Sequence, residues 1–424
     1  MDKLVLLVLA SMFVININCI QVLLVSMDGF RWDYLTKVST PNFDRLARHG
    51  TKARYINNTF ITKTFPSHYS IVTGLYEESH GIIGNKMYDP VFNSTFNLRN
   101  HETRWWNGGE PLWVTARRQN LTSATYFWAG SEAEIRGYRP NIWKPYKKSV
   151  PFKNRIDTAI KWLTDKQIDL VLLYFHEPDA TGHAYGPDSP QIIDKVKAMD
   201  KILGYLLDKF DSHTLTNKVN LILTSDHGMT TIDTANKVVD ITDHVDMSKI
   251  QFTVDNGPIM QVQPILGQID NVVRSLRKVS HISVFKKEEI PYHWHYRNNR
   301  RIMPVFLLAE EGWSITKNKT LASLYRGRGA HGYDNRLNSM KPIFLARGPN
   351  IKENYITDTF RSIDIYSTIC HLLDIKPAPN NGSLTVTSSF LVATKGSNAA
   401  NANIVSFLTF VLCTLLKILG AVCC

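Results

Sequence analysis

The chain has 424 residues, of which 44% are hydrophobic and 20% are charged, and its formal net charge is +12. This composition excludes a disordered or fibrous protein and is typical of a globular one. Only Arg297–Arg301 forms a tight basic cluster, and no zinc finger, helix-turn-helix or RNA-binding motif is present. We therefore expect no nucleic-acid binding.

Residues 1–19 have the features of a signal peptide. Lys3 is followed by an apolar run from Leu4 to Ile15, and the small residue Cys19 stands at a plausible cleavage point. Export is also indicated by five Asn-x-Ser/Thr sequons, which predict glycosylation at Asn57, Asn93, Asn120, Asn318 and Asn381. Because Cys370 is the only cysteine in the body of the chain, we expect no internal disulfide.

The body of the chain alternates between strand and helix patterns. Short apolar runs predict buried strands at Gln21–Met27, Leu170–Phe175, Val219–Thr224, Met303–Leu308 and Pro342–Ala346. Helices are predicted over Asn42–His49, Ser189–Phe210 and Thr359–Leu373. This alternation predicts an α/β fold in which a mostly parallel central sheet has helices on both faces.

Side chains that bind metals in proteins cluster where predicted strands end. They are Asp28, Asp179, His183, Asp226, His227 and, near a further glycine, His331. Sheets of this type bind ligands beyond the carboxyl ends of their strands. Carboxylates and imidazoles together suit zinc, but six ligands are too many for one tetrahedral ion. We therefore expect two Zn²⁺ ions. Taken singly, each Asp also fits a helix cap and each His a structural role.

Thr64 is the candidate nucleophile. Pro66 is favoured in the first turn of a helix, which predicts a helix over Pro66–Thr73 with Thr64 near its N-terminus. Backbone amides and the helix dipole stabilise anionic oxygens at this position. A threonine hydroxyl needs a metal or a base to lose its proton, and zinc would supply that activation. The alternative is a plain N-cap threonine.

These motifs together resemble the ecto-nucleotide pyrophosphatase/phosphodiesterases, within the alkaline-phosphatase superfamily, over roughly Gln21–Pro379. The closest likeness is to short members with a catalytic domain and a C-terminal anchor. The motifs that carry the resemblance are Thr62–Pro66, Ile71–Leu75, Glu78–Gly81, Asn85–Pro90, Asp226–Met229 and His331–Asn335. The resemblance implies an alkaline-phosphatase-like fold and a catalytic domain over residues 20–379.

The resemblance also implies roles for individual residues. It places one zinc on Asp179, His183 and His331, and the other on Asp28, Thr64, Asp226 and His227. It makes Thr64 the nucleophile that forms a covalent nucleotide intermediate. Asn85 and the Thr64 amide would hold the phosphate oxygens.

The resemblance further implies a nucleotide pocket, with Phe65 and Tyr146 stacking on the base and Tyr174 nearby. Core packing is the alternative for each of the three aromatic side chains. Two features depart from the family pattern. Glu132 stands where an aspartate is usual, and the stretch Arg99–Gly109 looks shortened and lacks an obvious pocket lysine. Both leave the base and sugar preference open.

The end of the chain predicts attachment to a membrane. Residues 380–403 are expected to form a polar stalk, and Ile404–Cys424 is almost wholly apolar. This segment fits a single membrane span or a lipid-anchor signal. We favour the span narrowly, because short family members are commonly single-pass proteins. Either mode of attachment predicts a protein at the plasma membrane with its catalytic domain outside the cell.

The leading functional prediction is hydrolysis of nucleotides such as NAD, dinucleoside polyphosphates or nucleoside triphosphates. A choline-phosphodiesterase or lysophospholipase C with the same metal core is an enzymatic alternative, since aromatic and acidic residues also bind quaternary ammonium groups. An inactive surface adhesion glycoprotein is the non-enzymatic alternative. It ranks last, because all seven ligand positions carry suitable residues. Protein partners are not predicted.

Overall fold

The computed structural model describes residues 20–320 and 326–392. One compact unit extends to Phe390, and the account below concerns that unit. The predicted signal peptide and the predicted apolar segment at residues 404–424 lie outside the described residues. Within the described ranges, no helix is both long enough and apolar enough to cross a membrane.

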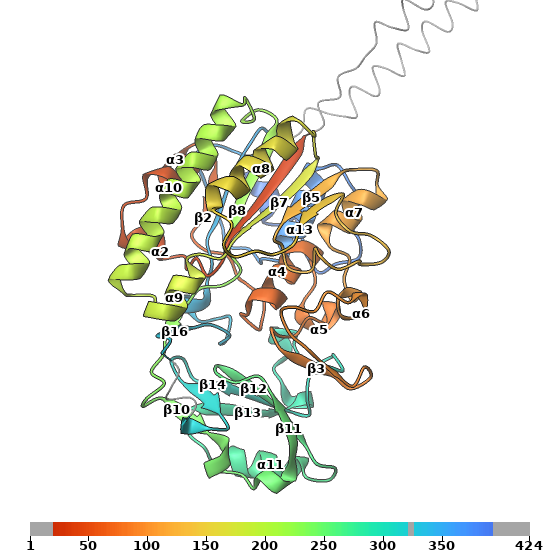
Figure 1. Cartoon of the computed structure of the whole chain (residues 1–424), viewed down its shortest axis with the longest axis vertical. Helices are drawn as coiled ribbons and strands as arrows, with labels where there is room; N and C mark the ends of the chain where they lie inside the picture. The colour runs from red at the N-terminus through yellow and green to blue at the C-terminus, as the bar shows by residue number, and fades with distance from the viewer. Residues whose placement is uncertain (1–19, 321–325, 393–424) are drawn as a thin grey trace, which may run out of the picture. The chain divides into compact units, whose positions relative to one another are not determined.

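The centre of the unit is an eight-stranded sheet (Figure 1). Its order is β18 (Tyr355–Thr357), β2 (Thr51–Ala53), β17 (Phe344–Arg347), β8 (Val219–Thr224), β1 (Gln21–Met27), β7 (Leu170–Phe175), β5 (Ser123–Tyr126) and β6 (Ile142–Lys144). The five strands from β8 to β6 are parallel, whereas β17 runs antiparallel to both β8 and β2. The sheet is therefore mostly parallel, as predicted.

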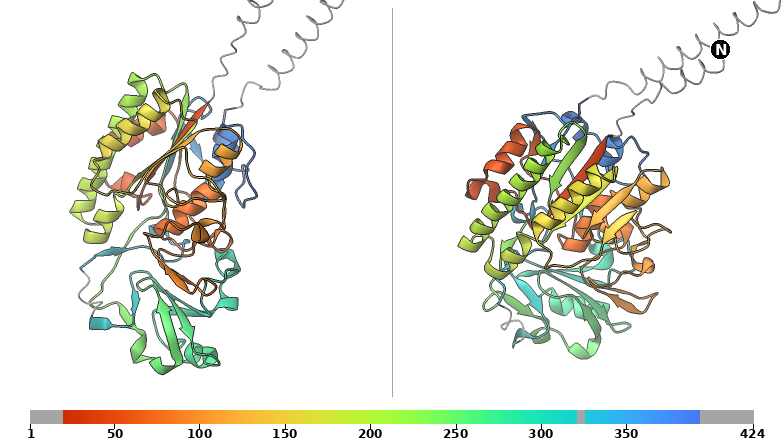
Figure 2. Two further views of the ribbon diagram at one scale, coloured as in Figure 1. Left: turned by 45° about the vertical axis from the view of Figure 1, so that its right-hand side comes forward. Right: turned by 45° about the horizontal axis from the view of Figure 1, so that its top comes forward.

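Helices cover both faces of this sheet (Figure 2). One face carries α3 (Pro41–Arg48), α8 (Phe152–Thr164) and α10 (Pro190–Ser212), whose apolar side chains join those of β1, β7 and β8 in one core. The other face carries α4 (Thr64–Thr73), α7 (Leu112–Arg118) and α13 (Asp364–Leu372). Because β1, β7 and β8 are covered on both sides, they read as continuous apolar runs, which is why their bounds were predictable.

A smaller antiparallel sheet forms a second layer of the unit. Its strand order is β11 (Ile250–Val254), β12 (Ile259–Pro264), β14 (Val305–Ala309) and β13 (Ile282–Lys286), and α11 (Ile269–Leu276) packs against it. The run Met303–Leu308 was predicted as a strand like those of the main sheet, but it corresponds to β14 of this second sheet. Its apolar residues are buried by α11 and the neighbouring strands. A buried strand of either sheet has the same apolar pattern, so the pattern could not show which sheet the strand joins.

Shorter elements connect these layers. They are α2 (Tyr34–Lys37), α5 (Glu77–His80), β3 (Met87–Asp89), β4 (Ser94–Phe96), α6 (Thr103–Trp106), α9 (Asp179–Tyr185), β9 (Thr230–Thr231), β10 (Val238–Asp240), β15 (Ser314–Thr316) and β16 (Gly329–Ala330).

Two sequence features acquire structural explanations. Within the basic cluster Arg297–Arg301, Arg301 is buried and Arg300 is exposed, and both pair with buried Asp89, at 2.7 and 2.9 Å. The helix predicted over Thr359–Leu373 begins at Asp364, because the Asp364 carboxylate accepts a hydrogen bond from the Arg361 amide and fixes a turn before the helix.

Residues 380–390, which we expected to begin a polar stalk, pack within the unit. Phe390 is fully buried and its ring lies 5.6 Å from that of Phe344 and 6.0 Å from that of Phe360.

We therefore expect Phe390→Ala to destabilise the unit by ~3–5 kcal/mol, because it removes a buried ring and leaves a cavity. Chemical denaturation of the purified protein measures this loss. Ser388→Ala, at an exposed position nearby, is the matched control and should change the free energy of unfolding by less than ~0.5 kcal/mol. Equal stability of the two variants would contradict the packing role of Phe390.

Candidate functional site

The predicted metal-ligand residues converge beyond the carboxyl ends of the central strands. Asp28 directly follows β1, and Asp226 with His227 follows β8. Asp179 and His183 lie one turn apart on α9, which comes after β7. His331 directly follows β16, which connects the site to the second layer. Residues from four separate segments thus form two groups, each with its donor atoms within 4.8 Å of one another.

The first group is Asp179, His183 and His331. The Nδ1 atoms of both histidines contact backbone oxygens, at 2.8 Å for His183 with Gly329 and 2.7 Å for His331 with Thr62. A carbonyl can only accept, so each Nδ1 carries a proton and each Nε2 is left with a lone pair. The two Nε2 atoms lie 3.1 Å apart. Two facing lone pairs repel each other unless a cation lies next to both.

The second group is Asp28, Asp226 and His227. The His227 Nδ1 atom donates to the Gly228 carbonyl at 2.9 Å, which again frees Nε2. That Nε2 lies 2.9 Å from Asp226 Oδ2 and 3.6 Å from Asp28 Oδ1. Neither oxygen has a hydrogen-bond partner, although both residues are fully buried. Orphaned buried carboxylate oxygens of this kind are expected where a cation binds.

Against the opposing effect of burial, the Asp226 carboxylate raises the pKa of the neighbouring His227 to about 9, so positive charge is favoured at this position. The electrostatics of Asp28, Asp179 and His183 also indicate a cation site. Burial and then the nearby Asp226 and Asp179 carboxylates raise the pKa of Asp28 well above its usual range. Burial raises the pKa of Asp179 to about 7. Burial also lowers the pKa of His183 to about 4, so its imidazole is neutral. Three carboxylates packed together are costly without positive charge, and divalent cations reverse that cost. The residues therefore fit two divalent cations.

Thr64 lies at the first position of α4, close to the second group. Its Oγ1 is 3.4 Å from His227 Nε2, and Lys63 is the N-cap residue of the helix. The Asn85 side chain accepts a hydrogen bond from the Phe65 amide at 2.9 Å. Asn85 is therefore held beside Thr64, where its amide group and the free N-terminal N–H groups of the helix can face an anionic oxygen.

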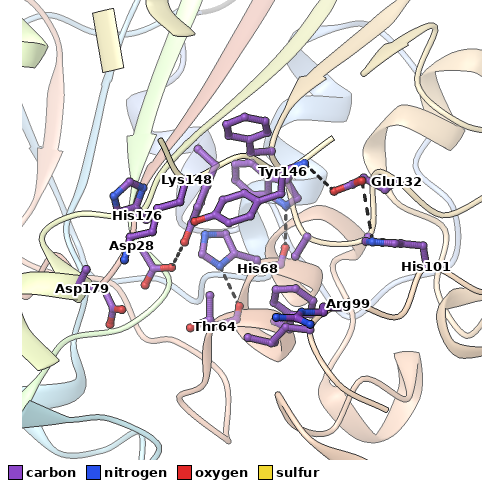
Figure 3. Close-up of a pocket in the computed structure, with 18 of the residues that line it drawn as sticks. Asp28, Thr64, His68, Arg99, His101, Glu132, Tyr146, Lys148, His176 and Asp179 are labelled. Atoms are coloured by element: carbon purple, nitrogen blue, oxygen red, sulfur yellow. Dashed lines mark hydrogen bonds and ion pairs between the residues drawn. The ribbon is translucent and has the colours of Figure 1, made fainter. Parts of the chain in front are cut away.

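A cavity of ≈450 Å³ opens next to Thr64 (Figure 3). Of the predicted substrate-binding residues, Phe65, Glu132, Tyr146 and Tyr174 line it, whereas Asn85 does not. Tyr146 is 49% exposed, which leaves its ring available to a ligand. Glu132 accepts a hydrogen bond from the Tyr146 backbone amide at 3.0 Å, so it supports the loop that carries this ring.

Tyr174 is positioned differently from a stacking residue. Its hydroxyl donates to Asp28 Oδ2 at 2.6 Å, and it therefore orients a candidate metal ligand.

Several residues of the cavity were not predicted. They are Leu98, Arg99, His101, Trp106, Phe127, Trp128, Lys148, His176 and His68. His68 is buried, and its Nδ1 lies 2.8 Å from the Thr64 carbonyl and 3.2 Å from Asp226. Its position four residues after Thr64, on the same side of α4, was a usable signal. Arg99, Lys148 and His176 come from loops, where sequence periodicity carries no information.

The sequon asparagines differ in exposure. Asn93, Asn120, Asn318 and Asn381 are exposed. Asn57 is partly buried, and its side-chain oxygen accepts a hydrogen bond from Lys341 at 2.8 Å.

Comparison with known families gives a match over most of the chain. The family described as "Type I phosphodiesterase / nucleotide pyrophosphatase" matches residues 22–334.

Among curated proteins, human ectonucleotide pyrophosphatase/phosphodiesterase family member 5 is 42% identical over 369 residues, covering 86% of this chain and 76% of that protein. The bis(5'-adenosyl)-triphosphatase enpp4 of Xenopus laevis is 39% identical, covering 89% of this chain and 82% of that protein. Mouse family member 7 is 37% identical, covering 94% of each.

Solved structures agree with these matches. The murine family member 5, as an inactive threonine-to-alanine variant in complex with AMP, is 40% identical with a TM-score of 0.84, covering 88% of this chain and 100% of that one. The human family member 5 structure has a TM-score of 0.85 with the same identity and coverage.

Proposed function

This chain belongs to the type I phosphodiesterase / nucleotide pyrophosphatase family, and on that basis we propose that it is a zinc-dependent hydrolase that cleaves nucleotides with Thr64 as its nucleophile. The observation that carries the proposal is the placement of Thr64 at the N-terminus of α4, 3.4 Å from a histidine of one ligand group and beside a cavity. A mixed set of nitrogen and oxygen donors favours zinc over magnesium or calcium.

The proposed zinc ions would be held by the two groups already described, with Thr64 added to the second. Bound there, they would lower the pKa of the threonine hydroxyl and of water, and neutralise charge on the phosphate. The remaining steps use residues of the chain. The α4 amides and Asn85 orient the phosphate for attack. Thr64 Oγ forms a bond to phosphorus as the bond to the leaving oxygen breaks. Water then hydrolyses the threonyl ester, which releases a mononucleotide and restores Thr64.

The relatives support both parts of this proposal. The murine structure bound to AMP is a threonine-to-alanine variant described as inactive, which supports a reaction that depends on threonine. Relatives named bis(5'-adenosyl)-triphosphatase support a substrate in which nucleosides are joined through phosphates. We therefore propose dinucleoside polyphosphates, NAD and nucleoside triphosphates as the substrate class. The "ecto" in the name of family member 5 supports an extracellular catalytic domain.

An assay of the purified protein tests the proposed activity. We expect release of nitrophenolate from p-nitrophenyl thymidine monophosphate and release of AMP from NAD and ATP. Hydrolysis of p-nitrophenyl phosphorylcholine but of none of the nucleotides would overturn the nucleotide assignment in favour of a choline phosphodiesterase.

Tyr146 supplies a prediction about the nucleoside end of the cavity. If its exposed ring and Phe65 hold a base between them, Tyr146→Ala removes one stacking surface worth ~1–3 kcal/mol. We expect KM for NAD or ATP to rise ~10-fold or more with little change in kcat. A simple nitrophenyl phosphodiester without a base is the control substrate and should be affected much less. Equal losses on both substrates would mean that Tyr146 serves the fold and not the base.

A further inference from the structure

At one end of the cavity, which we call its second half, two polar side chains have no role in the proposed function. In Figure 3, Glu132 and His101 lie on one side of Thr64, whereas His176 and Asp179 lie on the other, with Lys148 beside them. We propose that His176 and Lys148 form a subsite for a phosphate-bearing leaving group, such as pyrophosphate or a second nucleotide. This inference rests on the proposed function and names the part of the substrate that the second half of the cavity binds.

His176 is held as a hydrogen-bond donor. Its Nδ1 atom lies 3.4 Å from Arg155 Nη2. A guanidinium group can only donate, so Nδ1 accepts and the ring proton sits on Nε2. The ring also packs edge-on against Phe152, with centroids 5.1 Å apart. Burial and then the Arg155 charge lower the pKa of His176 to about 4. The imidazole is therefore neutral at physiological pH and offers one N–H group to a ligand.

Arg155 in turn is fixed by the backbone. Its side chain is buried and donates to the carbonyls of Val150, Lys148 and Tyr174, at 3.2, 3.1 and 2.9 Å. These bonds join the end of β7 to the loop that carries Lys148. Arg155 is therefore a positioning residue that sets the spacing between His176 and Lys148.

Lys148 supplies the positive charge of the subsite. It is exposed, and across residues 20–320 and 326–392 its ammonium group has no carboxylate within ion-pair distance. The nearby acidic residue Glu177 is already engaged by Lys195, at 3.2 Å, and by the Thr181 amide, at 3.0 Å. A free ammonium group and a fixed N–H group together match the oxygens of a phosphate.

The direction of attack assigns this subsite to the leaving group. In phosphoryl transfer the attacking and leaving oxygens are roughly in line through phosphorus. Thr64 attacks from the N-terminus of α4, so the leaving oxygen points away from that helix. His176 belongs to the segment between β7 and α9, three residues before Asp179, and in Figure 3 it lies on the same side of Thr64 as Asp179. The leaving group therefore departs past His176 and Lys148.

Two thymidine substrates that differ only in the leaving group test this inference. Thymidine triphosphate loses pyrophosphate, whereas p-nitrophenyl thymidine monophosphate loses nitrophenolate. We expect His176→Ala and Lys148→Ala each to lower kcat/KM for the triphosphate ~10-fold, the size of one charge-assisted hydrogen bond, and for the nitrophenyl ester less than ~3-fold. His176→Gln keeps an N–H donor and should recover part of the loss. Lys147→Ala, an exposed neighbour that does not line the cavity, is the matched control and should leave both rates unchanged.

A binding measurement separates the subsite from catalysis. In the metal-loaded Thr64→Ala background, calorimetry should show that His176→Ala weakens the binding of thymidine triphosphate ~10-fold and leaves the affinity for thymidine monophosphate unchanged. Equal losses on both ligands or both substrates would overturn the subsite. Failure of the wild-type protein to hydrolyse either substrate would overturn the proposed function, while the ratio of the two binding constants would still decide whether the subsite exists.

Discussion

Thr64→Ala is expected to abolish turnover while leaving the protein folded and able to bind metal and nucleotide. The hydroxyl is the atom that would bond to phosphorus, and among the cavity residues that the structure describes Thr64 alone carries an aliphatic hydroxyl. Removal of a covalent nucleophile typically lowers kcat by ~10³-fold or more. We expect α4 to remain intact in this variant, because the first turn of the helix is held by backbone hydrogen bonds, such as that from the Ser67 amide to the Lys63 carbonyl, which do not involve the Thr64 side chain.

Thr64→Ser is the matched variant for this prediction. Serine keeps the hydroxyl but lacks the methyl group that restricts its rotamer, so we expect a rate between those of the wild type and the alanine variant. Circular dichroism and AMP binding by calorimetry check that both variants fold. Hydrolysis by Thr64→Ala at a rate close to that of the wild type would rule out the covalent route.

The second large effect is expected from the metal groups. We expect elemental analysis to find two zinc ions per chain, and prolonged incubation with a chelator to remove activity that added zinc restores. His331→Ala should lose metal and activity together. Its Nδ1 bond to the Thr62 carbonyl orients Nε2 towards the site, and alanine offers no donor atom in its place.

His371→Ala is the control for this experiment, because His371 is exposed and belongs to α13, outside the ligand groups. It should retain both ions and full activity. Asp226→Asn adds a second check: the amide keeps the volume of the carboxylate but removes the charge that the cation needs, so metal content should fall without unfolding. Full activity in excess chelator would refute a metal-dependent reaction.

Local features of the sequence determined the core of the fold. The runs at β1, β7 and β8 are apolar throughout because both faces of these strands are buried, and this pattern is visible without any knowledge of neighbours. The polar residues that follow these runs could also be expected to lie close together, because parallel strands end at a common edge of the sheet. The candidate ligands were therefore accessible from their positions after the strands, and their division into two groups from the family resemblance. The position of Pro66 predicted a helix over Pro66–Thr73, whereas α4 begins two residues earlier, at Thr64.

The tertiary structure alone decided how these residues are oriented. The free nitrogen of each candidate ligand histidine is set by a backbone carbonyl, and the carbonyls of Gly329 and Thr62 are far from their histidines in sequence. Tyr174 is likewise turned towards Asp28 by a hydrogen bond across neighbouring strands.

The second half of the cavity could not be predicted from the sequence, because its residues are also placed by tertiary contacts. His176 and Lys148 occupy loops, and Arg155, which positions both, does so through contacts to their backbone and ring that no periodic pattern encodes. The assignment of Met303–Leu308 to the smaller sheet also depended on pairing with distant strands. The hydrophobicity of a run of residues indicates from the sequence alone that the run will be buried. The direction of a hydrogen bond and the choice of a strand partner depend instead on segments that only folding brings together.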